Sequence, residues 1–300
     1  MNKEKSCLTI TSRTSDLIAR ASEIEETDVR ASGQLGFMAR ALAQTTLPHS
    51  KIAGTEFERS NGMYTLSIHV PKKIGVLPYG AIPRILTAWI STEAVKTQCP
   101  DLVLGCSLRD FMDKLGMNNN NGGERGDITR LKSQAKSLFS SVVSIIEDDE
   151  KARNSFGIEN ILMVRGAQLL WNPRKPEEPG LFDSHLSLTN DFFKMVTDRP
   201  VPIDLRVLHA LRRSPLAMDI YVWSVYRLFI TRQDVLVPWL NLKGQFGANY
   251  AQTPQGLLDF KREFIKRLKE VVVFYPQAKM EPCKDGLKLS PSALHIPLKS

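Results

Sequence analysis

The sequence predicts an α+β protein made of two folded units, preceded by an N-terminal arm that is partly helical. The length of 300 residues suits two domains of ordinary size. The stretch WNPRKPEEPG at residues 171–180 disfavours both helix and central strand, so it marks a connection between two halves. Each half shows the same order of elements: an apolar helix, a short helix, a longer basic helix and a two-stranded hairpin.

The composition is that of an ordinary globular protein with an excess of positive charge. Apolar residues make up 42% and charged residues 24%, and charges interrupt the apolar runs before the roughly 18 residues that a membrane span needs. No secretory signal or cysteine framework is evident, which predicts a cytoplasmic protein without a membrane partner. The net charge is +8, and residues 196–300 hold 16 basic against 9 acidic side chains. This surplus makes nucleic acid the first partner to consider.

The arm is assigned to residues 1–46, where weak helical patterns occur at 16–21 and 35–42. The first unit is assigned to 47–180 and the second to 181–300. No repeat of residue identity relates the two units, so their similarity lies in the order of elements.

The first unit opens with a strand, predicted at 63–70 by alternating apolar and polar residues. An apolar helix follows at 82–95. Ser107 and Asp110 then form a capping box at the start of a short helix, which Gly116 ends.

A longer helix is predicted at 127–141, where apolar residues recur at three- and four-residue spacing. Two strands are expected after it, at 142–146 and 158–164. The outer face of the longer helix is polar or basic and carries Thr129, Arg130, Lys132, Ser133, Lys136 and Ser137.

The second unit repeats this order. An apolar helix is predicted at 216–229, a short helix at 238–246, and Pro254 begins a long amphipathic helix. Strands are predicted at 271–275 and near 287–289. The outer face of the long helix is again basic and includes Lys261, Arg262, Lys266, Arg267 and Lys269.

This order of elements is typical of a winged helix, whose third helix lies in the major groove of DNA. The fold class predicted is therefore α+β, with two tandem winged-helix domains and an N-terminal arm. Ordinary surface helices also carry charged outer faces, which is the simpler explanation for either helix alone. The duplication, and the scarcity of acidic residues on both faces, favours DNA binding.

Several long stretches resemble plasmid replication initiator proteins of the RepA type, which are related to the TrfA initiators. They are GFMARALAQTTLPHS (36–50), PYGAIPRILTAWISTEAVKTQ (78–98), LGCSLRDFMDKLGM (104–117), GGERGDITRLKSQAKSLFSS (122–141), LTNDFF (188–193) and PIDLRVLHALRRSPLAMDIYVW (202–223). The resemblance implies an initiator that binds direct repeats (iterons) in double-stranded origin DNA and helps to open the duplex. It also implies recruitment of the host replication initiator and the replicative helicase, and dimerisation through the first winged helix, so a homodimer is a candidate assembly.

Carried onto this chain, the DNA-reading elements of the family fall at 122–136 and 252–269. Arginine suits bidentate contacts with guanine, whereas lysine mainly binds phosphate. The candidate DNA-binding residues are Arg125, Thr129, Arg130, Lys132, Ser133 and Lys136 in the first unit, and Asn249, Tyr250, Gln252, Lys261, Arg262, Lys266 and Lys269 in the second.

No pattern of an enzyme is found. The chain lacks a P-loop for nucleotide hydrolysis, and its histidines and cysteines do not occur at metal-ligand spacing. No catalytic residue, metal or cofactor is therefore expected, and the acidic run at 147–150 is interpreted as a solvated turn. Two alternatives remain open: a transcriptional regulator with tandem winged helices, and an adaptor that binds proteins.

Overall fold

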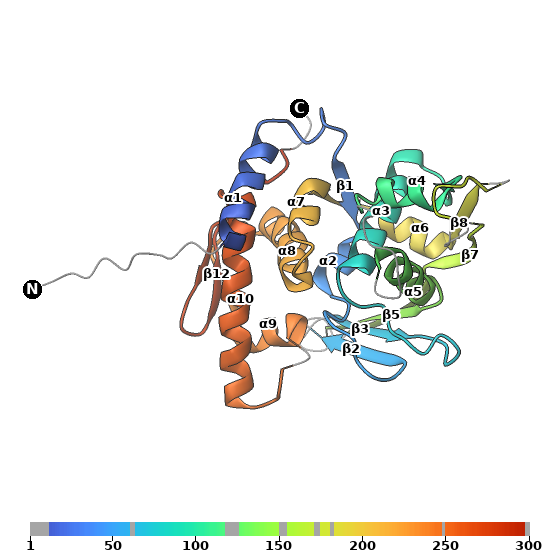
Figure 1. Ribbon diagram of the computed structural model, residues 1–300. Coiled ribbons are helices and arrows are strands. Elements are labelled where there is room, and N and C mark those ends of the chain that lie inside the picture. The colour runs from blue at the N-terminus through green and yellow to red at the C-terminus, as the bar shows by residue number, and fades with distance from the viewer. Residues whose placement is uncertain are drawn as a thin grey trace, which may run out of the picture.

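The computed structural model describes residues 12–60, 64–117, 126–149, 155–170, 175–180, 183–247 and 250–297. The fold is α+β, as expected, with helices at the centre and small antiparallel sheets around them (Figure 1). The two apolar helices, α3 (Ala81–Thr97) and α8 (Pro215–Ile230), are buried along most of their length. They form the middle of the core, on which the other elements pack.

The described part of the arm is folded. Helix α1 (Ser12–Glu25) packs on α10 and α7, strand β1 (Leu35–Met38) pairs antiparallel with β9 (Val201–Asp204), and α2 (Arg40–Gln44) packs on α8. The helix expected at 35–42 is therefore wrong in its first half. Alternate residues of β1 are buried, and the Phe37 amide donates to Thr92 Oγ1 of α3, so tertiary pairing outweighs a weak helical pattern.

The first unit contains the predicted helices. Ser107 Oγ accepts a hydrogen bond from the Asp110 amide at the start of α4 (Leu108–Lys114), and Gly116 takes a left-handed φ of 62° after it. Helix α5 (Asp127–Phe139) follows. These observations confirm the N-cap at Ser107, which is one half of the predicted capping box, and the stop at Gly116.

The sheet of the first unit has the order β2-β3-β5-β6. Its strands are β2 (Glu56–Ser60), β3 (Tyr64–His69), β5 (Val142–Asp149) and β6 (Ser155–Leu162). The hairpin predicted after the long helix thus lies beside the strand predicted before it. The start of the acidic run belongs to β5 rather than to a turn.

A second sheet crosses residue 180. Its order is β4-β8-β7, with β4 (Asp101–Gly105), β8 (Ser184–Leu188) and β7 (Val164–Gln168), and α6 (Asn190–Thr197) follows it. The expected boundary at residue 180 therefore falls between two paired strands. Residues 175–180 also lie against α4, since Pro176 O accepts from the Arg109 amide.

The second unit continues with α7 (Leu205–Ala210), α8, β10 (Val235–Pro238), α9 (Trp239–Phe246) and α10 (Pro254–Phe274), then β11 (Met280–Pro282) and β12 (Gly286–Leu289). The strand expected at 271–275 is wrong. Helix α10 continues there because Leu268, Val271 and Phe274 lie on its buried face at helical spacing. The strand near 287–289 is confirmed.

Each short helix is preceded by a strand that the sequence analysis did not include: β4 before α4 and β10 before α9. In the second unit this strand joins the hairpin of the same unit, in the order β10-β12-β11. In the first unit it pairs with β8 instead. The two units therefore share an order of elements but differ in how their sheets are assembled.

Candidate nucleic-acid interface

Helix α5 presents the predicted polar face to solvent. Thr129, Arg130, Lys132, Ser133 and Lys136 are all exposed, and 60% of the Arg130 side chain is accessible. Arg130 Nη1 lies 3.4 Å from Asp127 Oδ1 in the first turn, where the helix dipole favours an acidic residue. Ser137 does not belong to this face: it is buried, and its hydroxyl donates to Val76 O.

The segment before α3 holds α5 in place. Gln134, buried on the inner side of α5, accepts a hydrogen bond of 2.7 Å from the Tyr79 amide. A surface hollow of about 210 Å³ lies between this segment and the exposed face of α5. It is lined by Thr129, Arg130, Ser133 and Gln134 on one side and by residues 79–82 on the other. A guanidinium, two hydroxyls and the N-terminus of α3 therefore face the same space, which makes it electrically attractive to an anion.

Helix α10 also carries exposed cations, but acidic residues accompany them. Arg262 is 75% exposed, and its Nη2 lies 2.5 Å from Asp259 Oδ1. Arg267 is largely buried between Glu263 and Glu270. The expectation of a face poor in acids is therefore wrong for α10. Lys266 and Lys269 are exposed, as expected.

Lys261 is held against the turn between β11 and β12. Its Nζ donates to Lys284 O at 3.1 Å and lies 5.0 Å from the centroid of the Trp239 ring. Trp239 Nε1 in turn donates to Cys283 O. These contacts tie α9, α10 and the hairpin together, so Lys261 has a structural role besides any contact with DNA.

The entrance to α10 is organised by a lysine that the sequence analysis missed. Lys243 of α9 is 5% exposed, and its Nζ donates to Ala251 O at 2.7 Å and to Gln252 Oε1 at 3.0 Å. Lys243 therefore fixes the backbone at Ala251 and the side-chain amide of Gln252. A lysine inside a short amphipathic helix gives no sequence signal of this role, because its acceptors lie in the next loop.

Tyr250 is half-buried rather than free in a polar loop. Its ring packs edge-on against Phe260 with centroids 5.7 Å apart, and burial raises the pKa of its hydroxyl. A role in DNA contact stays a prediction. Arg125 and Asn249, two further candidates, lie outside the described residues.

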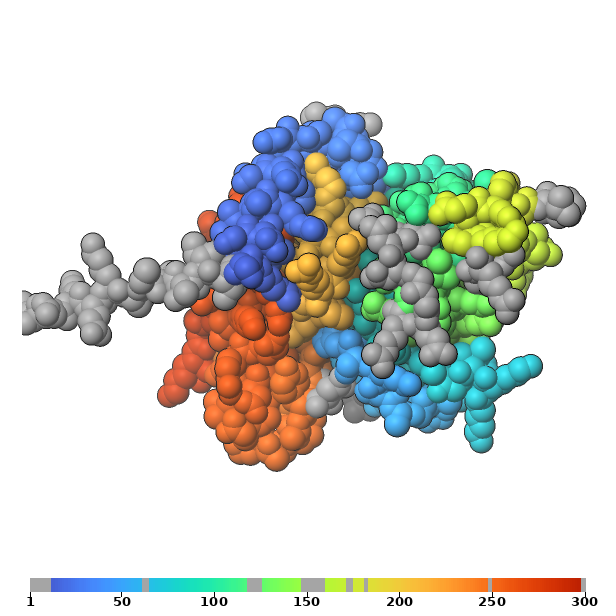
Figure 2. Space-filling view, viewed as in Figure 1, coloured from blue at the N-terminus to red at the C-terminus, as the bar shows by residue number. Residues whose placement is uncertain are grey.

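The two basic helices lie at the surface in different parts of the molecule. Figure 1 shows α10 along the left side and α5 on the right, with α8 and α2 between them. In Figure 2 the segment of α7 and α8 reaches the surface beside the orange region that contains α10. The candidate residues thus form two groups rather than one continuous patch.

Three histidines in the described parts of the chain are largely buried. Burial lowers the pKa of His49, His209 and His295 to about 4. Within those parts, no group of three or more His, Cys, Asp or Glu side chains has the geometry to hold a metal ion. No described helix is both long and apolar enough to cross a membrane.

The fold is similar to that of solved structures. A crystal structure of domain 2 and domain 3 of RctB matches with a TM-score of 0.51 and 10% sequence identity, covering 84% of this chain and 98% of that chain. A second crystal structure of RctB domains 2-3 has a TM-score of 0.49 and 11% identity, covering 84% and 97%. At such identities the likeness shows the fold alone. Comparison with curated protein sequences finds no match.

The family comparison is more specific. The family model described as "Plasmid encoded RepA protein" matches residues 77–236. This range contains α3, α4, α5 and α8, and thus most of the stretches that carry the resemblance to RepA-type proteins. Because the match covers more than half of the 300 residues, the chain belongs to the family of plasmid encoded RepA proteins.

Proposed function

We propose that this RepA-family protein initiates plasmid replication by binding direct repeats (iterons) in double-stranded origin DNA through α5 and α10. The observation that carries the proposal is the pair of exposed basic helices. Each follows a short helix and precedes an antiparallel hairpin, and the chain that bears them belongs to a plasmid encoded family. Helices of this kind fit the major groove, which admits one helix.

The arrangement supports two tandem winged helices. In the second unit, α8, β10, α9, α10, β11 and β12 follow in the order of a winged helix, and the first strand pairs with the last. The first unit has the same order from α3 to β6, although β4 pairs outside the unit. We assign the two winged helices to 47–180 and 181–300, preceded by the arm at 1–46.

The candidate residues divide into two classes. Arg130 and Arg262 suit base recognition because a guanidinium donates to two acceptors of guanine, worth roughly 1–3 kcal/mol of discrimination. Lys132, Lys136, Lys266 and Lys269 suit phosphate, which adds affinity that falls as salt rises. Thr129 and Ser133 line the hollow beside Arg130, where a phosphate group fits the donors available.

The remaining steps of initiation are assigned to partners. The protein acts without catalysis of its own: it helps to open the duplex and recruits the host replication initiator and the replicative helicase, which carries out further unwinding. We place it in the bacterial cytoplasm with its plasmid, and we assign self-association to the first unit.

Footprinting on the DNA that flanks the encoding gene tests the proposal. Protected direct repeats at helical-turn spacing are expected. Protection of a single promoter palindrome would instead favour a transcriptional regulator.

A titration of the same DNA across salt concentrations tests the mode of binding. A steep fall in affinity is expected as salt rises, because cations on the protein displace counterions. Replacing Arg130 by Ala should weaken binding to the repeats, whereas Arg165→Ala should not. Arg165 is the matched control because it is 70% exposed, lies 3.7 Å from an acidic residue (Asp101) and belongs to β7 rather than to either basic helix. Weak binding that is insensitive to salt would favour the adaptor.

A further inference from the structure

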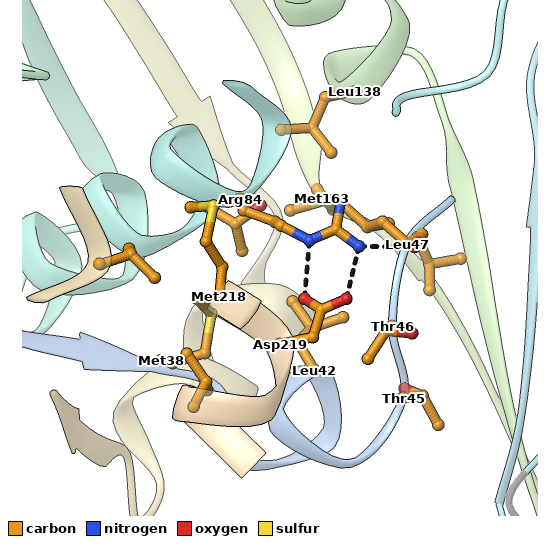
Figure 3. A pocket seen from close by; sticks show the side chains of 14 residues that line it. Met38, Leu42, Thr45, Thr46, Leu47, Arg84, Leu138, Met163, Met218 and Asp219 are labelled. Carbon is orange, nitrogen blue, oxygen red and sulfur yellow. Dashed lines mark hydrogen bonds and ion pairs between the residues drawn. The ribbon is translucent and has the colours of Figure 1, made fainter. Parts of the chain in front are cut away.

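The two units meet where α3 packs on α8, a contact that we call the joint. A buried ion pair between Arg84 of α3 and Asp219 of α8 lies in it (Figure 3). Arg84 Nε donates to Asp219 Oδ1 at 2.7 Å, and Arg84 Nη2 donates to Asp219 Oδ2 at 2.6 Å. The side chains are 5% and 10% exposed. Two parallel bonds fix the orientation of both groups as well as their distance, which a single contact does not do.

The same arginine also fixes the chain that enters the first unit. Arg84 Nη2 donates to Leu47 O at 2.6 Å, and Nη1 donates to Pro48 O at 3.1 Å and to Gly80 O at 2.7 Å. His49 Nε2 lies 2.8 Å from Asp219 Oδ2. One guanidinium therefore connects α3, α8 and residues 47–48, and His49 joins the cluster through Asp219.

Asp219 is charged and His49 is neutral in this cluster. Burial by itself raises the pKa of Asp219, but the Arg84 charge and the hydrogen bonds from His49 and Arg84 outweigh it and lower the pKa. Burial lowers the pKa of His49 to about 4. The Arg84–Asp219 pair is thus a true ion pair across the joint at neutral pH.

Neighbouring contacts extend the joint to the helix before α10. Thr46 Oγ1 donates to Gln245 O of α9 at 3.0 Å, and Gln245 Nε2 donates back to Gln44 O at 2.6 Å. Gly244 of α9 lies against β2, since a Cβ there would be 2.6 Å from Ser60 O. The segment next to the joint therefore contacts α9, the helix that precedes the basic helix α10.

The apolar packing around the pair contains flexible side chains. A small cavity of about 30 Å³ adjoins it, lined by three methionines, Met38, Met163 and Met218 (Figure 3). Methionine is flexible and adapts to irregular space, so such a lining tolerates small rotations of one unit against the other. The directional polar contacts therefore add an orientation that this part of the lining does not fix by itself.

We propose that Arg84 and Asp219 are positioning residues that set the register between α5 and α10, and so the spacing of the two DNA subsites that the protein accepts. Helix α3 packs on α5, and α8 packs on α10, so each partner of the ion pair is one helix away from a DNA-contacting helix. This assignment of DNA subsites rests on the function proposed above. Neither residue touches DNA.

The first test measures the geometry without DNA. Spin labels at Lys132→Cys on α5 and Lys269→Cys on α10, in a chain with Cys7, Cys99, Cys106 and Cys283 replaced by Ser, report the distance between the helices. Asp219→Asn and Arg84→Lys are expected to shift or broaden the distance distribution. Arg84→Lys keeps the charge but loses the two parallel bonds, and serves if Asp219→Asn does not fold.

Asp204→Asn is the matched control. Asp204 is 3% exposed and forms a bidentate pair with Arg206, but both residues lie in the β9–α7 corner rather than across the joint. This control should leave the distance distribution unchanged. An unchanged distribution in both Asp219→Asn and Arg84→Lys would overturn the proposal.

The second test measures DNA spacing. Duplexes selected by the wild-type protein from a random pool are remade with one base pair inserted between, or deleted from, the two contacted segments. The wild-type protein should bind these at least about tenfold more weakly, and Asp219→Asn should reduce that preference to about threefold or less. Full retention of the preference by a folded variant would contradict the assignment. If the wild-type protein selects no duplex, the proposed function fails, and the spin-label distances still decide the role of the pair.

Discussion

The two units present their basic helices in different ways, although their elements follow the same order. Helix α5 has 13 residues and exposed polar side chains, with Arg130 Nη1 at 3.4 Å from Asp127 Oδ1. Helix α10 has 21 residues, and Arg262 and Lys261 are held by Asp259 and by Trp239 with Lys284. The cationic side chains Lys261 and Arg262 of α10 are thus held by intramolecular contacts before any ligand binds. The cationic side chains of α5 are held by weaker contacts.

The cores differ in the same direction. In the second unit, Phe264 packs against Trp239, Phe246 and Phe260 with ring centroids 5.5–5.9 Å apart. The β10-β12-β11 sheet beside these rings is built from strands of that unit alone, whereas β8 and β9 pair with strands outside it. In the first unit the β4 strand pairs across the expected boundary. We infer that the part of the second unit from β10 to β12 is the more self-contained reader of DNA. Two units with the same order of elements can therefore differ in how firmly the side chains of their basic helices are held.

Removal of the central ring of the second unit should have the largest effect. Phe264 is fully buried, so Phe264→Ala leaves a cavity among three aromatic rings and should cost about 3–5 kcal/mol of unfolding free energy. Urea unfolding measures the loss. Limited proteolysis should show cleavage in α9 and α10 while α4 and α5 stay protected. Equal exposure of both units would mean that the second unit is not self-contained.

Base contacts by the two arginines provide the next comparison. Arg130→Ala and Arg262→Ala should each weaken specific binding by roughly 1–3 kcal/mol, with little change in melting temperature. The Arg262 variant should lose more, because Asp259 loses its cationic partner and keeps only the hydrogen bond from Gln255 Nε2, so its charge repels the phosphates. Asp259→Asn should accordingly tighten non-specific binding. Fluorescence anisotropy with repeat and scrambled duplexes measures all three, and equal losses would remove the distinction between α5 and α10.

Much of the fold follows from local sequence signals. The N-cap at Ser107, the stop at Gly116, Pro238 just before α9 and Pro254 at the first position of α10 mark helix ends by local chemistry. The errors lie where tertiary contacts decide. Residues 35–38 become a strand because β9 is available, and residues 271–274 stay helical because the core extends beneath them.

The candidate site was predictable as a set of exposed cations but not as a set of pairs. Asp259 and Arg262 stand at i and i+3 in the sequence, a spacing that predicts their ion pair on one face of the helix. The roles of Lys243 and of the Arg84–Asp219 pair depend on residues 8 to 135 positions apart, which no local pattern reports.

Acid should destabilise the second unit before the first. His49, His209 and His295 belong to this unit or contact it, and burial lowers their pKa from 6.5 to about 4. The unfolded chain therefore binds more protons between pH 6.5 and 4, so stability is greatest above 6.5 and falls as pH decreases through this window. Each histidine contributes on the order of 1 kcal/mol per pH unit.

Urea unfolding at pH 7, 6 and 5 measures this slope. His209→Gln should reduce it by about one third of the part due to the three histidines, whereas His69→Gln, at an exposed position, should not. Hydrogen exchange at pH 5 should show earlier loss of protection in α8 and α10 than in α4 and α5. Simultaneous loss in both units would contradict the comparison.

Two lysines of α10 test whether contacts within the protein limit how its charges contribute to DNA binding. Lys266 is exposed, so Lys266→Met should lower the slope of log affinity against log salt by about 1 and leave stability unchanged. Lys261 contacts Trp239 and Lys284, so Lys261→Met should change the slope less and cost about 0.5–1 kcal/mol of stability. The two variants differ only in position on one helix, which makes each the control for the other. Equal salt slopes would show that Lys261 leaves its intramolecular contacts when DNA binds, and that the surface of α10 is no better arranged in advance than that of α5.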